Sequence, residues 1–303
     1  FFSLGIMSAL TLADVYALGV WKFTGGCTLF FLMVRQILVP FVFRPASYLM
    51  LGLARDKKNL TKNEKSSIMK LEKYMWHSFA YIVLVAWCTR VLMAHEWGFS
   101  ITAMTHYPAL EDYETDIEIP LLQWTYMSWY CHGVLESMIV DIGRSDFFMM
   151  MLHHLLSVGM LYGSWVSGGH RVGFLITFEQ DISDIVTYGA KMVVKATSDI
   201  EDYKPVSHRA ARLQAFCGVI LSLAWFSCRH VTLGLIVYML WTQFVTDAFT
   251  LYMKVMLTVF WVLQLIWGTY IFKLTYSQVT TGHHFDGYND SDHTKGEKEK
   301  KKK

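Results

Sequence analysis

Two long apolar runs separated by a glycine pair decide the fold of this chain. Residues 147–194 read FFMMMLHHLLSVGMLYGSWVSGGHRVGFLITFEQDISDIVTYGAKMVV, and Gly168-Gly169 lies between the two runs. A helix needs about 20 predominantly apolar residues to cross a bilayer, and each run is about that long. Because glycine pairs favour turns, the sequence predicts two membrane helices joined as a hairpin.

Comparable runs recur along the 303 residues, of which 53% are hydrophobic and only 17% charged. An ordinary soluble domain would carry more charge, and the period-2 alternation of a membrane barrel strand is missing. Polar residues and prolines interrupt the first two runs, so we expect one or two N-terminal apolar helices before a core of six spans. The predicted fold is an all-α polytopic membrane helix bundle with apolar segments at 4–21, 27–54, 75–95, 121–141, 147–167, 172–194, 213–239 and 251–275.

The charges between these segments predict their orientation. Segment 55–74 holds seven Lys or Arg, and loop 195–212 is basic again, whereas loops 96–120 and 240–250 hold none. By the positive-inside rule, the basic segments, residues 144–146 and the tail face the cytosol. We therefore divide the chain into N-terminal membrane helices (1–54), a cytosolic basic linker (55–74), a membrane domain (75–275) and a disordered, cytosolic basic tail (276–303).

Four ionisable residues lie inside the opening pair of runs: His153, His154, Asp181 and Asp184. A charged residue at the bilayer centre costs roughly 2.5–3.5 kcal/mol on insertion scales, so such residues are functional candidates. An imidazole can act as a general base or as a nucleophile toward an acyl group. The alternative for the histidines is a pair of core side chains bonded to neighbouring helices, and for the aspartates it is structural pairing with a buried cation.

Further polar residues could complete a site. Asp146 shares a helix face with His153, seven residues on, and with Arg144 it lies at the membrane edge, where ordinary interfacial charges are the alternative. Arg229 lies within run 213–239 and would either pair with an acidic side chain or bind a substrate phosphate or head group. No metal-ligand spacing occurs among the histidines and five cysteines, so no metal site is predicted.

The stretch from Asp141 to Met192 resembles the Lag1 motif of the TLC-domain family, the signature of ceramide synthases. The resemblance extends more loosely from Lys70 to Gly282. One departure is Gln180, where animal members usually have a histidine before the first aspartate. The landmarks that carry the motif are Arg144, Asp146-Phe147, Met150, His153-His154, Ser164, Arg171-Val172-Gly173, Asp181, Ser183-Asp184 and Ala190-Lys191-Met192.

The resemblance implies a transferase of the endoplasmic reticulum membrane that N-acylates a sphingoid base with a fatty acyl-CoA, an acyltransferase of the EC 2.3.1 class. Acyl-CoA is then a co-substrate, and no cofactor or nucleic acid is implied. Membrane lipid surrounds the protein, and both a homodimer and a heterodimer remain open. The family's essential residues map to His153, His154, Asp181 and Asp184. The residues predicted to bind substrate are Arg144, Asp146, Arg171, Lys191 and Arg229, and those predicted for the basic rim that meets coenzyme A are Arg144, Lys191, Lys195 and Arg209.

Two other functions compete with this one. A di-iron hydroxylase or desaturase needs several His-x-x-His-His clusters, and the twelve histidines form none. A non-catalytic TLC-domain lipid sensor or carrier commonly lacks the complete set of two histidines and two aspartates, which this chain has. The four lysines at the end of the chain resemble a dilysine retrieval signal, and a disordered basic tail near anionic lipid is the alternative.

Overall fold

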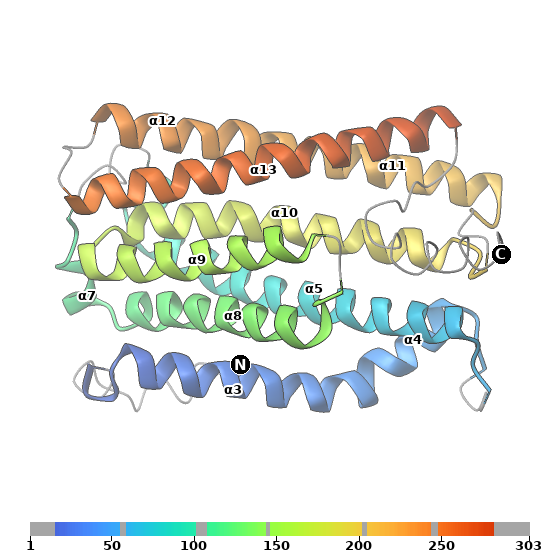
Figure 1. Ribbon diagram of the computed structural model, residues 1–303. Coiled ribbons are helices and arrows are strands. Elements are labelled where there is room, and N and C mark those ends of the chain that lie inside the picture. Colours follow the sequence, from blue (N-terminus) through green and yellow to red (C-terminus); the bar gives the residue numbers. More distant parts are fainter. Residues whose placement is uncertain are drawn as a thin grey trace.

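The computed structural model describes residues 16–54, 59–100, 108–143, 146–201, 205–243 and 248–281. The greater part of the expected segment 4–21, Arg144 and the lysine-rich tail lie outside these residues. Helices dominate the described part, in which the only β-type pairing is an isolated bridge between Ser198 and Pro205. The long helices run side by side, with the N-terminal rod at one edge and the C-terminal helices at the other (Figure 1).

The helices follow the apolar runs of the sequence closely. The N-terminal rod comprises α3 (Val20–Leu38), η1 (Val39–Phe43) and α4 (Arg44–Met50). The core contains α5 (Lys62–Ala94), the short α7 (Asp112–Thr115), α8 (Glu118–Val140), α9 (Phe147–Ser167), α10 (His170–Ala196), α11 (His208–Ala224), η2 (Trp225–Thr232), α12 (Leu233–Gln243) and α13 (Ala248–Thr281).

The predicted hairpin is present as α9 and α10. Gly168 adopts a φ of 71°, in the left-handed region, and its backbone N–H bonds back to the end of α9. A side chain is rarely tolerated at such a φ, which explains the glycine. Small residues also let the two helices approach each other closely. A Cβ at Gly173 would lie 3.0 Å from the Ser164 hydroxyl oxygen.

Helix α5 begins earlier than the apolar run that predicted it. The Glu64 N–H donates to the Thr61 hydroxyl over 3.2 Å, and the Thr61 N–H donates to the Glu64 carboxylate over 2.9 Å. This capping box stabilises the start of a helix at Lys62, so most of the segment expected to be a linker belongs to α5. Hydropathy locates where a helix enters lipid, whereas capping residues decide where the helix starts.

Five helices are long and apolar enough to span a membrane, which confirms an all-α membrane bundle. They are Val20–Met50, Lys62–Ala94, Phe147–Ser167, His208–Gln243 and Thr250–Thr280. Helix α8 is buried along nearly its whole length because α3, α5, α9 and α10 contact it. Helices that are surrounded by protein can carry more polar residues than helices that face lipid, and this is why α8 and α10 are less apolar.

The prolines expected to interrupt the second apolar run are accommodated within a continuous rod. Pro40 lies in the π-helical segment η1, and Pro45 lies in the first turn of α4. Proline removes a backbone donor and clashes with the preceding turn, and a π-helical turn can absorb both effects.

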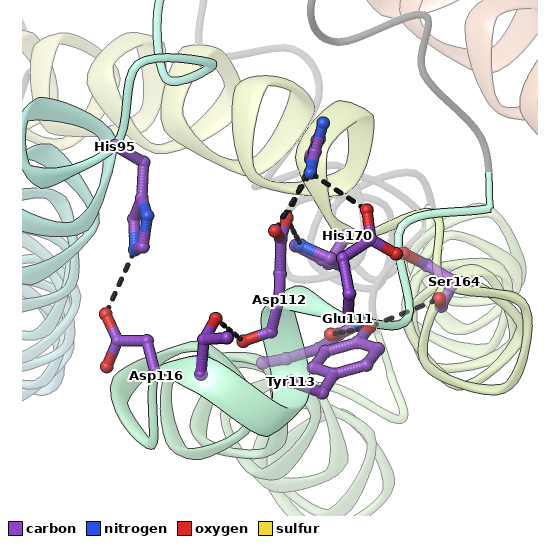
Figure 2. A network of polar contacts seen from close by, with 10 residues as sticks. His95, Glu111, Asp112, Tyr113, Asp116, Ser164 and His170 are labelled. Atoms are coloured by element: carbon purple, nitrogen blue, oxygen red, sulfur yellow. Dashed lines mark hydrogen bonds and ion pairs between the residues drawn. The ribbon is translucent and has the colours of Figure 1, made fainter.

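The two ends of the bundle differ in charge. We call the end that contains Lys70, Lys73, Asp146 and Lys195 the basic end. The opposite end, with Glu111, Asp112, Asp116 and Glu118, is called the acidic end. At the acidic end, Asp112 bonds His170, and His95 bonds Asp116 (Figure 2).

Candidate active site

A cavity of about 480 Å³ opens between the helices at the basic end. It lies between two hydrophobic clusters, one built around Trp76, Tyr126 and Trp129 and the other around Trp225 and Phe260. Its walls come from α5, α8, α9, α10, α11, η2 and α13, and thus from segments far apart in the sequence. His153, His154 and Asp184 all line it, so three of the four predicted catalytic residues share one cavity.

The ring of His153 is held by aromatic side chains of α13. It stacks on Phe260 with ring centroids 4.9 Å apart and meets the edge of Trp267 at 5.3 Å. The residue is only 8% exposed. Aromatic packing on two sides leaves the imidazole little freedom to rotate, which is an arrangement suited to a reacting group that must be held in place.

His154 packs on the other side of α9, against α8. Its ring lies so close to Gly133 that a Cβ there would be 2.8 Å from Cε1 and 3.0 Å from Nδ1 of His154. The two imidazole centroids are 5.4 Å apart, and Tyr130 lies about equally far from both, at 6.3 and 6.2 Å. Adjacent helical residues point about 100° apart, and this rotation brings one ring to α13 and the other to α8.

Both histidines have the same hydrogen-bonding state at Nδ1. In each ring this nitrogen is buried and has no hydrogen-bond partner among the described residues. Nε2 is therefore the ring nitrogen that remains for contact with the cavity. A neutral imidazole with a proton on Nδ1 has a lone pair on Nε2, and so it can accept a proton or attack an acyl carbon.

Asp184 is tied to a buried arginine on the π-helix η2. The Arg229 Nη2 donates to the Asp184 Oδ1 over 2.5 Å. The other Arg229 bonds run to the Ser183 hydroxyl at 2.6 Å, the Gln264 side-chain oxygen at 2.9 Å and the Gln180 backbone oxygen at 3.0 Å. Arg229 thus lines the cavity with its guanidinium bonded on every nitrogen, and it pairs with an acidic side chain, which was the structural alternative to substrate binding.

Asp181 lies one turn away from Asp184 and behind the cavity wall. It is fully buried beside Tyr126 of α8, and neither carboxyl oxygen has a hydrogen-bond partner among the described residues. The structure therefore separates the two predicted aspartates. Asp184 faces the cavity, whereas Asp181 faces the packed interior between α10 and α8.

A second polar cluster lies in the cavity wall, and the pairing within it was not predicted. Glu136 is buried and pairs with Arg35 at 3.1 Å and with the Nε2 of His77 at 3.2 Å. The Nδ1 of His77 lies 2.9 Å from the Lys73 backbone oxygen. Contacts at both ring nitrogens therefore hold the His77 imidazole in one orientation in the wall.

The remaining predicted binding residues divide between the two ends. Asp146 and Lys191 line the cavity, and the Lys191 ammonium lies 5.2 Å from the ring centre of Tyr188. Arg171 lies at the acidic end, where it pairs with Asp112 and sits over the Trp97 ring. It is 13 residues from Asp184, or about 20 Å along α10 at 1.5 Å per residue. Arg144 lies outside the described residues.

Comparison with known proteins identifies the family. The family model described as the TLC domain matches residues 70–273, about two thirds of the chain. The chain belongs to the TLC-domain family. The match covers α8, α9 and α10 in full, about three quarters of α5, and α13 as far as Lys273, so the TLC domain contains His153, His154, Asp181 and Asp184.

Several curated relatives of this TLC-domain chain are named ceramide synthases. Mouse ceramide synthase 3 is 28% identical over 134 residues, which are 43% of this chain and 33% of the relative. Ceramide synthase 1 LOH3 of Arabidopsis thaliana is 24% identical over 223 residues, 72% of this chain and 67% of the relative. Human ceramide synthase 5 is 25% identical over 138 residues, 46% of this chain and 34% of the relative. The matched part spans about a third of the length of the mouse and human relatives and two thirds of that of the Arabidopsis relative.

The wall residues that the sequence interpretation missed also fall largely within the TLC domain. Lys73, His77 and Glu136 lie in the matched range, whereas Arg35 precedes it on the N-terminal rod. The available signal was the presence of His77 and Glu136 inside apolar runs, where ionisable groups need a partner. Their pairing across α5 and α8 could not be found from sequence spacing, because the two residues are 59 positions apart.

Proposed function

We propose that this TLC-domain protein is a ceramide synthase that transfers a fatty acyl group from acyl-CoA to the amine of a sphingoid base. The observation that carries the proposal is the shared cavity: His153, His154 and Asp184 line one space that also contains several lysines. The names of the curated relatives support the same activity. In the reaction the thioester C–S bond breaks, an amide C–N bond forms, and the CoA thiol leaves with a proton.

A histidine of the pair serves this reaction in one of two alternative ways. Nε2 of one ring either removes the proton from the substrate ammonium or attacks the thioester carbon to form an acyl-imidazole that the amine then cleaves. The packing of His153 between Phe260 and Trp267 favours it as the group that meets the acyl carbon. In this proposal Asp184, whose Oδ1 accepts a hydrogen bond from Arg229, binds the substrate ammonium.

The basic end fits the soluble part of acyl-CoA. Lys70, Lys73 and Lys195 line the cavity near its end, and a cationic rim attracts phosphate groups. The charge distribution of the loops supports a cytosolic position for this end, where acyl-CoA is present. The endoplasmic reticulum location remains a proposal that rests on the family resemblance.

A turnover assay with purified protein tests the proposal. Wild-type protein in detergent should convert sphinganine and palmitoyl-CoA to an N-acyl product, detected by mass spectrometry. His153→Ala and His154→Ala should each lower the rate by about 10²- to 10⁴-fold, because proton transfer or covalent catalysis is lost. His208→Ala is the matched control, since His208 is exposed at the start of α11, and it should keep the wild-type rate.

Unchanged turnover in both cavity variants would overturn the assignment of the histidines. Binding of acyl-CoA without any turnover by the wild type would favour the lipid carrier instead. Incubation with palmitoyl-CoA alone then separates the two mechanisms, because a nucleophilic histidine leaves an acyl adduct on the intact protein. A general base leaves the protein mass unchanged.

A further inference from the structure

A second cavity lies next to the histidine site. It has a volume of about 90 Å³ and lies between α9, α10, α12 and α13, extending toward Gly168 and Arg171 at the acidic end. Tyr130 and Phe260 line it, and both also contact His153. Apolar atoms form most of the surface that its lining exposes, as a site for a lipid chain requires, although Arg171 and Lys254 also line it.

Two polar side chains in this lining have unsatisfied hydrogen-bonding groups. Gln180 is 2% exposed, and neither the amide nitrogen nor the amide oxygen of its side chain has a partner among the described residues. Ser164 is 3% exposed, and its hydroxyl is likewise unpaired within the described part of the chain. Buried polar groups are nearly always hydrogen-bonded in folded proteins, so each such group needs an explanation.

The position of Gln180 along α10 can be compared with those of Asp184 and the histidines. Gln180 precedes Asp184 by four residues, which places it about 6 Å along α10 from the level of Asp184. Ser157, also in the second cavity, follows His153 by four residues on the antiparallel α9. Because Gln180 and Ser157 line the same cavity, Gln180 lies near the level of Ser157, which is about one helical turn along α9 from His153, whereas Ser164 lies about 16 Å from His153 along α9.

We propose that the Gln180 side chain binds a hydroxyl group near the reacting end of a lipid substrate, and that the second cavity thereby selects hydroxylated chains. A carboxamide offers both a donor and an acceptor, and a hydroxyl can pair with both. A chain without a hydroxyl leaves both amide atoms buried and unpaired. A site built to bind a hydroxyl therefore binds such a chain more weakly. The inference deepens the proposed acyl transfer and rests on it. The hydroxyl belongs to either the acyl chain or the sphingoid base.

A competition assay distinguishes these two sources. In one arm, equal amounts of palmitoyl-CoA and 2-hydroxypalmitoyl-CoA compete for sphinganine. In the other arm, sphinganine and 4-hydroxysphinganine compete for palmitoyl-CoA, and mass spectrometry gives the product ratios. The wild type should prefer the hydroxylated substrate in one arm. The near-isosteric variant Gln180→Met should reduce that preference about tenfold, because the loss of one hydrogen bond changes a binding constant by about that factor.

Matched variants and probes make the result decisive. Leu240→Met changes the same cavity without changing its polarity, so it should leave both product ratios as in the wild type. Palmitoyl-CoA hydroxylated at carbon 16 should gain nothing from Gln180, because its hydroxyl lies far from the reacting end. Equal product ratios for wild type and Gln180→Met in both arms would overturn the proposal, and so would a Gln180-dependent preference for the 16-hydroxy chain.

A binding measurement keeps this inference separate from the activity itself. Thermal unfolding of the wild-type protein is followed with palmitate and with 2-hydroxypalmitate, and with sphinganine and 4-hydroxysphinganine. A larger stabilisation by the hydroxylated member of one pair supports the proposal even where no turnover occurs, and equal stabilisation in both pairs contradicts it. Absence of product from every acyl-CoA, in contrast, contradicts the proposed acyl transfer.

Discussion

At the scale of single residues, the site depends on how closely side chains approach one another. Gly133 lets the His154 ring lie against the backbone of α8, and any larger residue would occupy the same space. On the opposite side of α9, Phe260 and Trp267 fix His153. Both imidazoles are therefore positioned by contacts with other helices.

Gly133→Ala tests the importance of this contact. The added Cβ would lie 2.8 Å from the His154 Cε1, so the ring must move. We expect N-acyl transfer to fall about 10²-fold, the cost of roughly 1 Å of misplacement in a catalytic site. The rate with sphinganine and palmitoyl-CoA is the measurement. Gly189→Ala in α10 is the control, because a Cβ there meets nothing within 4 Å, and full activity of Gly133→Ala would refute the positioning argument.

At the scale of elements, the π-helix η2 brings a buried cation to the site. It joins α11 and α12 into one rod, and its wider turn carries Arg229 toward α10. Such segments are rare and often occur at functional sites. Arg229 is 2% exposed and binds Asp184, Ser183 and the Gln180 backbone, so it joins η2 to α10 and neutralises Asp184.

Removing this cation should destabilise the bundle. Arg229→Met leaves the Asp184 carboxylate without its partner, and breaking a buried pair from one side costs about 3–5 kcal/mol. Denaturant unfolding in detergent, followed by circular dichroism, is the measurement. The double variant Arg229→Met with Asp184→Asn should recover part of the loss, because no uncompensated charge remains. A single variant as stable as the wild type would show that the pair contributes little.

At the scale of the whole molecule, a cluster of polar side chains around Asp112 connects segments of the chain at the acidic end. Arg171 donates to both Asp112 carboxylate oxygens, at 2.6 and 2.8 Å, and the His170 Nε2 lies 2.8 Å from the same group (Figure 2). Both partners stand at the N-terminus of α10, where an anion is also favoured by the helix dipole. The cluster thus links the segment before α8 to the α9–α10 hairpin.

This cluster predicts a pH dependence of stability. Burial raises the pKa of the Asp112 carboxyl, but hydrogen bonds from Arg171 and His170 outweigh burial, and the pKa lies below its ordinary value. The ionised group therefore stabilises the fold above the unfolded pKa of about 3.9, and this contribution is lost as the pH falls through the lower folded pKa. Asp112→Asn should be less stable than the wild type at pH 7.

Thermal unfolding of wild type and Asp112→Asn between pH 7 and pH 3 measures this effect. The difference between the two proteins should stay constant at neutral pH and shrink below about pH 4, where wild-type Asp112 is protonated as well. Glu111→Gln is the control, because an exposed ion pair contributes little. A difference that grows as the pH falls would have the wrong sign for this explanation.

The amino-acid sequence by itself determined the class of fold and the identity of the central candidates. Apolar runs of bilayer length and the Gly168-Gly169 pair predicted the membrane bundle and its central hairpin, because length and hydropathy are properties of a single segment. The cost of ionisable groups in lipid singled out His153, His154, Asp181 and Asp184 in the same way. These conclusions needed no knowledge of which helices are neighbours.

Only the tertiary structure decided which of these residues meet. It placed Asp184 in the histidine cavity and Asp181 behind its wall, and it left Arg171 about 20 Å along α10 from Asp184, the partner of Arg229. It also paired His77 with Glu136, and it left the side-chain amide of Gln180, in a second cavity, without a hydrogen-bond partner among the described residues. The physical reason is that a helix directs side chains all around its axis. Packing between helices, which the spacing along one helix does not encode, determines which side chain faces which neighbour.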